Sequence, residues 1–193
     1  MGLRVSFDLE EDDLNHFRLI MREARKAAAQ SSPEDIIEGA TGLLRQVGTV
    51  SVPQFIRDRL DKLQLMIKMV SDAEWRLPQQ ESLRVLNALA YFSEPEDLIP
   101  DHIPGLGFLD DAIMIELVVR ELRHEIEAYS DFCDYRSQQG NRRGTAENEG
   151  KAPDVATREE WLAARRKALQ SRMRRRRKKR NEQAGHSRPP RLL

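Results

Sequence analysis

Apolar residues recur at intervals of three and four along most of this chain, the spacing that places them on one face of an α-helix. The periodicity predicts helices over residues 9–29, 33–47, 53–72 and 79–94, and a fifth helix over residues 112–132. No segment alternates apolar and polar residues for long enough to build a sheet. The pattern therefore predicts an all-α fold, a compact bundle of about five helices.

Residues typical of helix ends support this assignment. Asp8 and Glu11 have the spacing of a capping box, and Ser32 supplies a capping hydroxyl directly before Pro33. Pro95 lacks an amide donor, so we expect it to end the fourth helix. These residues set the expected starts of the first two helices and the end of the fourth.

The connection between the fourth and fifth helices has the most unusual composition. Residues 91–111 read YFSEPEDLIPDHIPGLGFLDD, with three prolines, two glycines and six carboxylates. Pro100 and Pro104 forbid a regular helix, whereas Gly105 and Gly107 permit positive φ angles. We expect a compact reversal of the chain here, within a helix-loop-helix motif.

The carboxylates of this motif have a structural and a chemical interpretation. Asp97 and Asp101 can accept hydrogen bonds from nearby backbone amides, and Asp110 or Asp111 can cap the fifth helix. The alternative is that they hold Mg²⁺ or Mn²⁺ in a metal-dependent hydrolase. We favour the structural interpretation because no base for such chemistry is evident, and His102 is not assigned as one; no cofactor is expected.

This motif resembles the signature of the YkvA-like family, bacterial proteins grouped as a domain of unknown function (1232). The resemblance covers residues 80–125 and implies no reaction. Some members of the family are associated with membranes, so the resemblance leaves attachment to a membrane surface open. The residues that carry it are Pro95, Asp97-Leu98-Ile99-Pro100-Asp101, Ile103-Pro104-Gly105, Gly107 and Asp110-Asp111.

The formal net charge of zero conceals an uneven distribution of charge. Residues 1–135 contain 14 Lys and Arg against 26 Asp and Glu, whereas residues 136–193 contain 18 against 6. Residues 136–156 have almost no large apolar side chain, which predicts a disordered linker. The sequence thus predicts an acidic domain over 1–135, a linker over 136–156 and a basic tail over 157–193.

The tail is expected to be partly helical with a disordered C-terminus. Thr157 and Glu160 have capping-box spacing, and Trp161, Leu169 and Met173 give the helix a modest apolar side. A dense run of cations follows, which we expect to bind a polyanion through its phosphates without sequence selectivity. These cations are Arg172, Arg174, Arg175, Arg176, Arg177, Lys178, Lys179 and Arg180.

Other chemical motifs are weak. Glu121 and His124 have the spacing found in di-iron bundles, but such a site needs two pairs of this kind. Cys133 is the single cysteine, so no intramolecular disulfide can form. No phosphate-binding glycine loop, serine nucleophile motif or zinc-spaced cluster occurs. No catalytic residue is assigned, and an enzyme is not favoured.

We therefore expect a non-enzymatic binding or adaptor module whose basic tail contacts nucleic acid or the ribosome. One alternative partner is an anionic membrane surface. Another is the acidic domain itself, on which the tail can dock. No export signal and no transmembrane segment are recognised, which predicts a cytoplasmic protein, with peripheral membrane attachment as the alternative.

Overall fold

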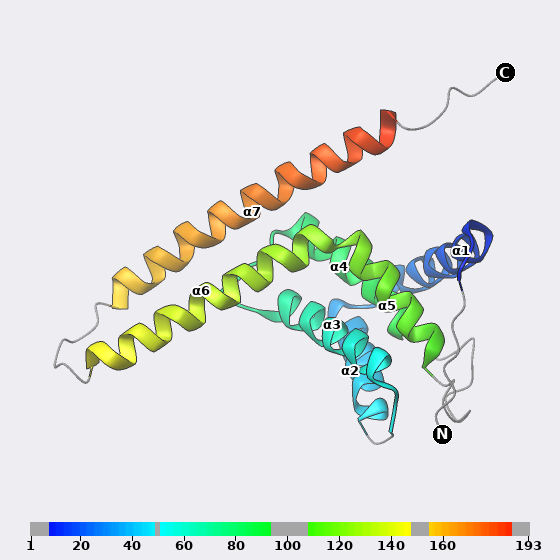
Figure 1. Cartoon of the computed structure of the whole chain (residues 1–193), viewed down its shortest axis with the longest axis horizontal. Helices are drawn as coiled ribbons and strands as arrows, with labels where there is room; N and C mark the ends of the chain where they lie inside the picture. Colours follow the sequence, from blue (N-terminus) through cyan, green and yellow to red (C-terminus); the bar gives the residue numbers. More distant parts are fainter. Residues whose placement is uncertain (1–7, 49–50, 94–107, 148–154, 187–193) are drawn as a thin grey trace. The chain divides into compact units, whose positions relative to one another are not determined.

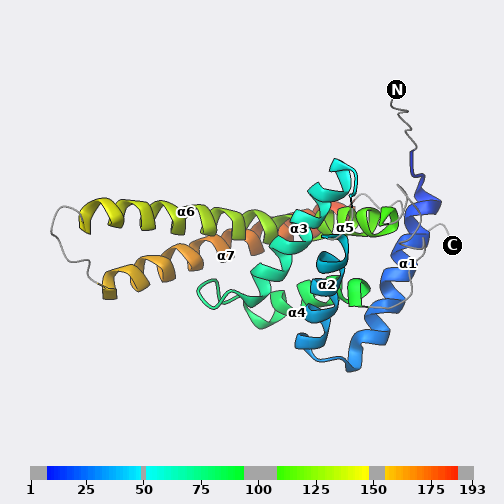
Figure 2. The same ribbon diagram turned by 90° about the horizontal axis from the view of Figure 1, so that it is seen from below.

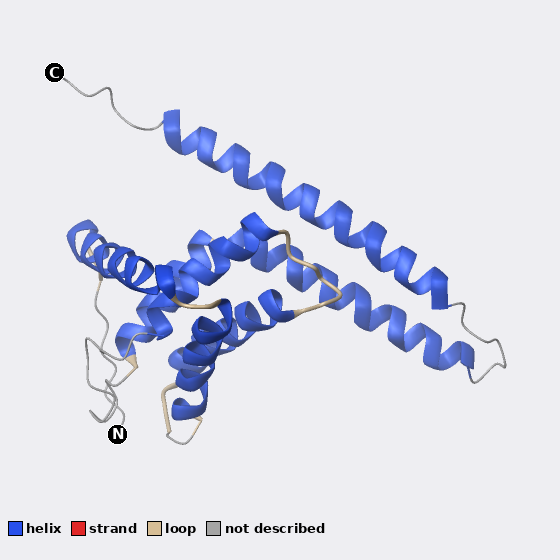
Figure 3. Cartoon of the chain, turned by 180° about the vertical axis from the view of Figure 1, so that it is seen from behind, coloured by secondary structure: helices blue, strands red, loops and turns tan. Residues whose placement is uncertain are grey.

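The helical fold predicted above is confirmed. Within the residues that the structure describes, every regular element is a helix, as Figure 3 shows. None of these helices is both long enough and apolar enough to cross a membrane. The computed structural model describes the backbone of residues 8–48, 51–93, 108–147 and 155–186, and side chains within 8–48, 51–93, 108–139 and 159–183.

The chain divides into two units. The first comprises Met1–Val70 and Pro78–Arg120, and the second comprises Ser71–Leu77 and Glu121–Leu193. The helices labelled in Figure 1, with the short 3-10 helices η1 and η2, are α1 (Glu11–Ala27), η1 (Ala28–Gln30), α2 (Pro33–Val47), α3 (Gln54–Ser71), α4 (Gln79–Leu89), η2 (Ala90–Ser93), α5 (Leu109–Glu121), α6 (Arg123–Glu147) and α7 (Val155–His186).

The start of α2 follows the prediction, whereas the start of α1 does not. Ser32 caps α2, because its hydroxyl accepts a hydrogen bond from the amide of Asp35 at 3.1 Å. In return the Asp35 carboxylate accepts from the hydroxyl and amide of Ser32, and these bonds lower the pKa of Asp35. The N-cap of α1 is Glu10 rather than Asp8, and its amide donates to Asp13 at 2.9 Å.

The short helix η2 packs against three helices of the first unit. It continues the chain where α4 ends at Leu89, and it packs against α1, α2 and α4. Tyr91 and Phe92 are buried there, with 7% and 6% of their surfaces exposed. The backbones of α2 and η2 approach so closely at Gly39 that a side chain there would overlap with Ser93 of η2. Glycine, which has no side chain, occupies this position of α2.

Two predicted boundaries are wrong. The expected fifth helix is two helices, because α5 ends at Glu121 and α6 begins at Arg123. The expected linker is also wrong over residues 136–147, which continue α6 to Glu147. The physical reason is that α6 is held by contacts distant in sequence, which composition does not record. Residues 148–154 lie outside the described part of the chain.

We predict opposite effects for alanine at two glycines of α2. A Cβ at Gly39 would lie 2.5 Å from Ser93 Cβ and 2.6 Å from its Cα, so Gly39→Ala must move the backbone of η2. We expect a loss of about 1–3 kcal/mol in unfolding free energy, measured by urea denaturation.

Gly42→Ala is the matched control, because nothing lies within 4 Å of a Cβ at that position. Alanine favours a helix over glycine by about 0.5–1 kcal/mol, so this variant should be slightly more stable than the parent. Equal stability of the two variants would contradict the close approach of α2 and η2.

Candidate functional site

Most of the predicted motif lies outside the residues that the structure describes. This applies to Asp97, Pro100, Asp101, Pro104, Gly105 and Gly107, so their structural or metal-binding roles stay predictions. Asp110 and Asp111 are described: they lie in the first turn of α5 and are only 2% and 4% exposed. Acidic side chains at this end of a helix are stabilised by its dipole. Among the described residues, no group of three or more His, Cys, Asp or Glu is placed to hold a metal.

The side chain of Asp72 organises the second unit. One carboxylate oxygen accepts hydrogen bonds from the amides of Glu74 and Trp75, at 2.8 and 3.0 Å. The other accepts from the Tyr129 hydroxyl at 2.9 Å and from Arg136 at 2.8 Å. A single carboxylate therefore closes the turn after α3 and joins that turn to α6.

Arg136 and Tyr129 both stabilise the ionised carboxylate of Asp72 by donating hydrogen bonds to it. Burial of Asp72 opposes ionisation, but its four hydrogen bonds outweigh burial and lower its pKa below the usual 3.8. Burial, the bond to Asp72 and the nearby Cys133 raise the pKa of Tyr129. Arg136 also pairs with Glu74 at 2.9 Å, and these bonds outweigh burial and raise its pKa. At neutral pH the site is an ionised carboxylate held by an arginine and a neutral phenol.

Aromatic packing also holds the turn at Asp72 and Trp75 against α6. Trp75 is fully buried, and its ring lies 5.1 Å from the Phe132 ring and 5.8 Å from the Tyr129 ring, measured between centroids. The Arg136 guanidinium lies over Phe132 at 5.5 Å. The turn that carries Trp75 is thereby fixed on α6.

The same turn contacts α7 through its backbone carbonyls. Arg166 donates to the carbonyl of Glu74 at 2.7 Å, and Gln170 donates to the carbonyl of Trp75 at 3.0 Å. Arg76 has a φ of 47°, which is uncommon for a residue other than glycine. Its carbonyl also faces Gln170, at 3.3 Å, so the left-handed turn presents successive carbonyls to α7.

Helices α6 and α7 pack side by side within this unit, as Figure 2 shows. Leu169 and Met173 of α7 are buried, with 2% and 1% of their surfaces exposed. They are therefore used in packing, whereas Trp161, on the predicted apolar side with them, is 48% exposed.

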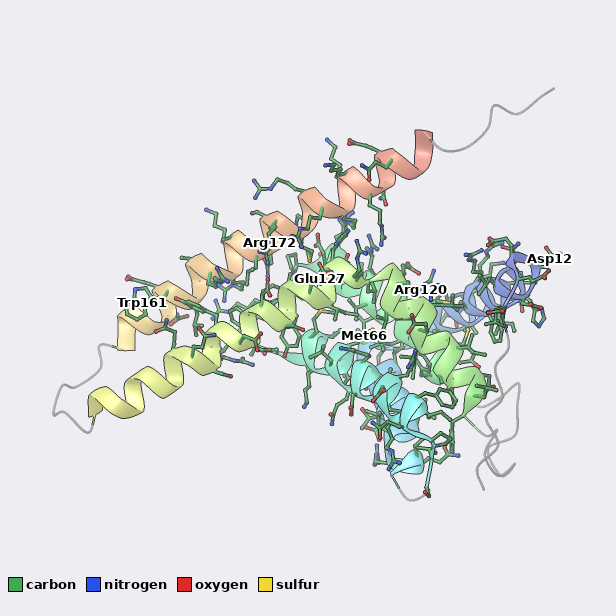
Figure 4. All side chains as sticks on the ribbon, viewed as in Figure 1. Asp12, Met66, Arg120, Glu127, Trp161 and Arg172 are labelled. Carbon is green, nitrogen blue, oxygen red and sulfur yellow. The ribbon has the colours of Figure 1, made fainter. Side chains whose placement is uncertain are left out.

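Four of the predicted polyanion-binding cations face α6. Arg172 pairs with Asp131, Arg176 with Glu127 at 3.1 Å, and Arg177 with Glu125 at 3.2 Å. Arg180 donates to the backbone carbonyl of Glu121 at 3.1 Å. Figure 4 labels Arg172 on α7 and Glu127 on α6 among the side chains between these helices.

These ion pairs differ in burial. In the Arg177–Glu125 pair, 15% of the arginine side chain and 1% of the glutamate side chain are exposed. In the Arg172–Asp131 pair, the values are 40% and 43%. The first pair is buried, and the second lies at the rim of the helix contact.

The other four predicted cations are exposed on α7. They are Arg174, Arg175, Lys178 and Lys179. Lys178 is 3.9 Å from Glu182 of the same helix, a weak surface pair. The basic run thus has one side engaged with α6 and another directed to solvent.

Sequence reasoning missed the anchor residues Asp72, Trp75, Tyr129 and Arg136. The helical pattern marks Asp72 only as the end of a helix. An aspartate whose carboxylate accepts hydrogen bonds from backbone amides two and three residues later is, however, typical of an Asx turn. The composition after Tyr135 predicts a linker, which includes Arg136. The pairing of these residues across 57 and 64 positions leaves no local signal.

Comparison with known proteins identifies one segment. A family model described as "Protein of unknown function (DUF1232)" matches residues 83–117. The resemblance to the YkvA-like family is thereby confirmed over part of α4, η2 and part of α5, all within the first unit.

One curated relative of this chain has a name that states no reaction. The chain is similar to the "Uncharacterized membrane protein YkvA" of Bacillus subtilis (strain 168), with 32% identity over 68 residues. The match covers 35% of this chain and 64% of the relative, so the chain spans less than two thirds of that relative's length. No solved structure matches the chain significantly.

We predict that Asp72 makes the second unit sensitive to acid. Its pKa is lowered in the folded chain, so its contribution to stability is present above the unfolded pKa near 3.8 and is lost as the pH falls through the folded value. Asp72→Asn should therefore lower stability at pH 7 and flatten the loss of stability between about pH 4 and pH 2. Urea denaturation of the two proteins at several pH values measures this.

Asp134→Asn is the control, since Asp134 is an exposed aspartate on α6, the helix that Asp72 contacts. It should retain the pH dependence of the parent. An Asp72→Asn protein with the parent's slope below pH 4 would show that Asp72 is not the acid-sensitive anchor.

We also predict that the buried ion pair stabilises the α6–α7 contact more than the rim pair does. Arg177→Met leaves the carboxylate of Glu125 buried without its arginine, which should cost about 3–5 kcal/mol. Arg172→Met removes a half-exposed pair and should cost about 0–1 kcal/mol. Hydrogen exchange of the α7 amides is the measurement, and equal costs would contradict the difference in burial.

Proposed function

We propose that this protein is a non-enzymatic binding module whose basic tail helix contacts a polyanion, with nucleic acid or the ribosome as the favoured partner. The observation that carries the proposal is the exposed basic side of α7, where Arg174, Arg175, Lys178 and Lys179 lie within two turns. Side chains spaced at i and i+4 share one side of a helix and can neutralise neighbouring phosphates.

The contact between α6 and α7 supports this proposal because it keeps the basic side of α7 exposed to solvent. The paired arginines, the buried Leu169 and Met173, and the carbonyls of the 72–76 turn all hold α7 along α6. An ordered helix loses less conformational entropy on binding than a disordered tail does. Acidic residues of α6 occupy the other arginines, which limits the number of phosphates that the docked helix can contact.

An anionic membrane surface is the second candidate partner. Two observations favour it: the relative from Bacillus subtilis is named a membrane protein, and Trp161 is exposed on the helix that carries the basic residues. Tryptophan is enriched at membrane interfaces, and each basic residue near an anionic surface contributes about 1 kcal/mol. Attachment in this mode is peripheral and electrostatic.

The proposal predicts a particular salt dependence. Each phosphate contact on duplex DNA contributes a slope of about −0.9 in log K against log salt, so four outward cations should give about −4. If α7 leaves α6 and all eight cations bind, the slope should approach about −7. Titration of labelled duplex DNA from 50 to 300 mM salt distinguishes these two modes.

A matched pair of variants tests the basic side itself. Arg175→Glu/Lys179→Glu reverses two outward charges, and we expect it to weaken binding at least tenfold. Lys62→Glu/Lys68→Glu changes the net charge equally on the exposed side of α3 and should retain at least half of the parent's affinity. If the two variants lose affinity equally, overall charge rather than α7 determines binding.

Vesicles form the second arm of this experiment. If the same α7 variant abolishes binding to phosphatidylglycerol vesicles while the parent ignores nucleic acid, the partner is the membrane surface. If the parent binds neither RNA, duplex DNA nor vesicles at 50 mM salt, the polyanion proposal is wrong.

A further inference from the structure

An open pocket of about 530 Å³ lies between α6 and α7, within the second unit. Arg123 of α6 and Arg176, Lys179 and Arg180 of α7 contribute to its lining. The one carboxylate among the lining residues is that of Glu127. The described lining therefore carries three positive charges in excess when His124 is neutral.

Glu127 already contacts several of these cations. It pairs with Arg176 at 3.1 Å and with Arg123 at 3.6 Å. Arg180 donates to the carbonyl of Glu121 at 3.1 Å, which holds its guanidinium at the pocket. One carboxylate cannot neutralise the three cations Arg123, Arg176 and Lys179, so the pocket keeps positive charge for a further anion.

His124 supplies a second observation that points to a ligand. It lines the pocket and is only 6% exposed, yet its Nδ1 atom has no hydrogen-bond partner among the described residues. The Oε2 atom of Glu127 lies 3.7 Å from Nδ1, beyond hydrogen-bond distance. A buried nitrogen in this situation costs free energy unless a ligand or water satisfies it.

We propose that this pocket binds a phosphate group. Arginine presents paired donors that match phosphate oxygens, and two arginines and a lysine from α7 meet one arginine from α6 here. Nδ1 of His124 donates to one phosphate oxygen in its N–H form. A phosphate dianion, as in a phosphomonoester, offsets most of the excess charge and satisfies this nitrogen.

The inference goes beyond the proposed function, because Arg123 and His124 belong to α6, and Lys179 is the one outward cation of α7 among the described lining residues. Inorganic phosphate can bind there whether or not a polymer contacts Arg174, Arg175 and Lys178. The phosphate can come from a nucleotide or from a lipid headgroup, which present the same chemical group.

Calorimetric titration of the full chain with inorganic phosphate, at low chloride concentration, tests the proposal. Arg123→Gln should weaken phosphate binding about tenfold, because it removes a charged donor from the pocket. The Arg123 side chain is 62% exposed, so its loss should leave the contact between α6 and α7 intact. Lys178→Gln removes one charge from α7 outside the pocket and should change affinity less than twofold. Glu127→Gln should bind phosphate more tightly than the parent, which a purely structural role of Glu127 does not produce.

Adenosine 5′-monophosphate and glycerol 3-phosphate distinguish the two sources. If both compounds compete equally with inorganic phosphate, the site recognises the phosphate group alone. If one of them binds more tightly than the other, that compound indicates whether the phosphate comes from a nucleotide or from a lipid headgroup. The proposal is overturned if phosphate binds more weakly than about 10 mM, or if Arg123→Gln and Lys178→Gln weaken binding equally. Failure of duplex DNA to bind, with phosphate binding retained, would count against the proposed function only.

Discussion

The ion pair between Arg177 and Glu125 is the constraint on which the second unit depends. Only 1% of the glutamate side chain is exposed, so its charge has lost most of its hydration. Such a charge is tolerated only when a partner compensates it, and separating the two is costly even where forming the pair adds little net stability. The acidic residues of α6 and the basic residues of α7 are therefore one structural feature.

Asp72 fixes the position from which this pairing extends. It orients the turn at Trp75 through two amides and joins that turn to α6 through Tyr129 and Arg136. The turn in turn offers its carbonyls to Arg166 and Gln170, which sets the register of α7. From that register, the helical repeat places Arg177 beside Glu125. A short segment between α3 and α4 thus determines which basic residues are engaged and which face solvent.

The sequence predicted the helical class and the cap of α2 because periodicity and capping are local. It did not predict the break at Leu122, since apolar residues continue through Leu122 and Ile126 without a proline or glycine. It placed a linker after Tyr135 because composition does not show that Arg136 pairs with residues more than sixty positions away. Seven of the eight predicted tail cations are consecutive in the sequence, so the sequence does not show which of them face α6. That division follows from the register of two packed helices, which no single segment encodes.

Screening by salt acts unevenly along this helix contact. At about 0.1 M salt the Debye length is near 10 Å, so half-exposed pairs such as Arg172–Asp131 weaken while a buried pair is largely protected. The polyanion proposed above would act on the same pairs in the same order, because it would reach exposed arginines first. It would recruit Arg172 and Arg176 from the rim while Arg177, Leu169 and Met173 keep α7 on α6. Exchange of partners at the rim would then give the tail a graded response to the proposed ligand, and the buried pair would set the limit beyond which the helix must separate.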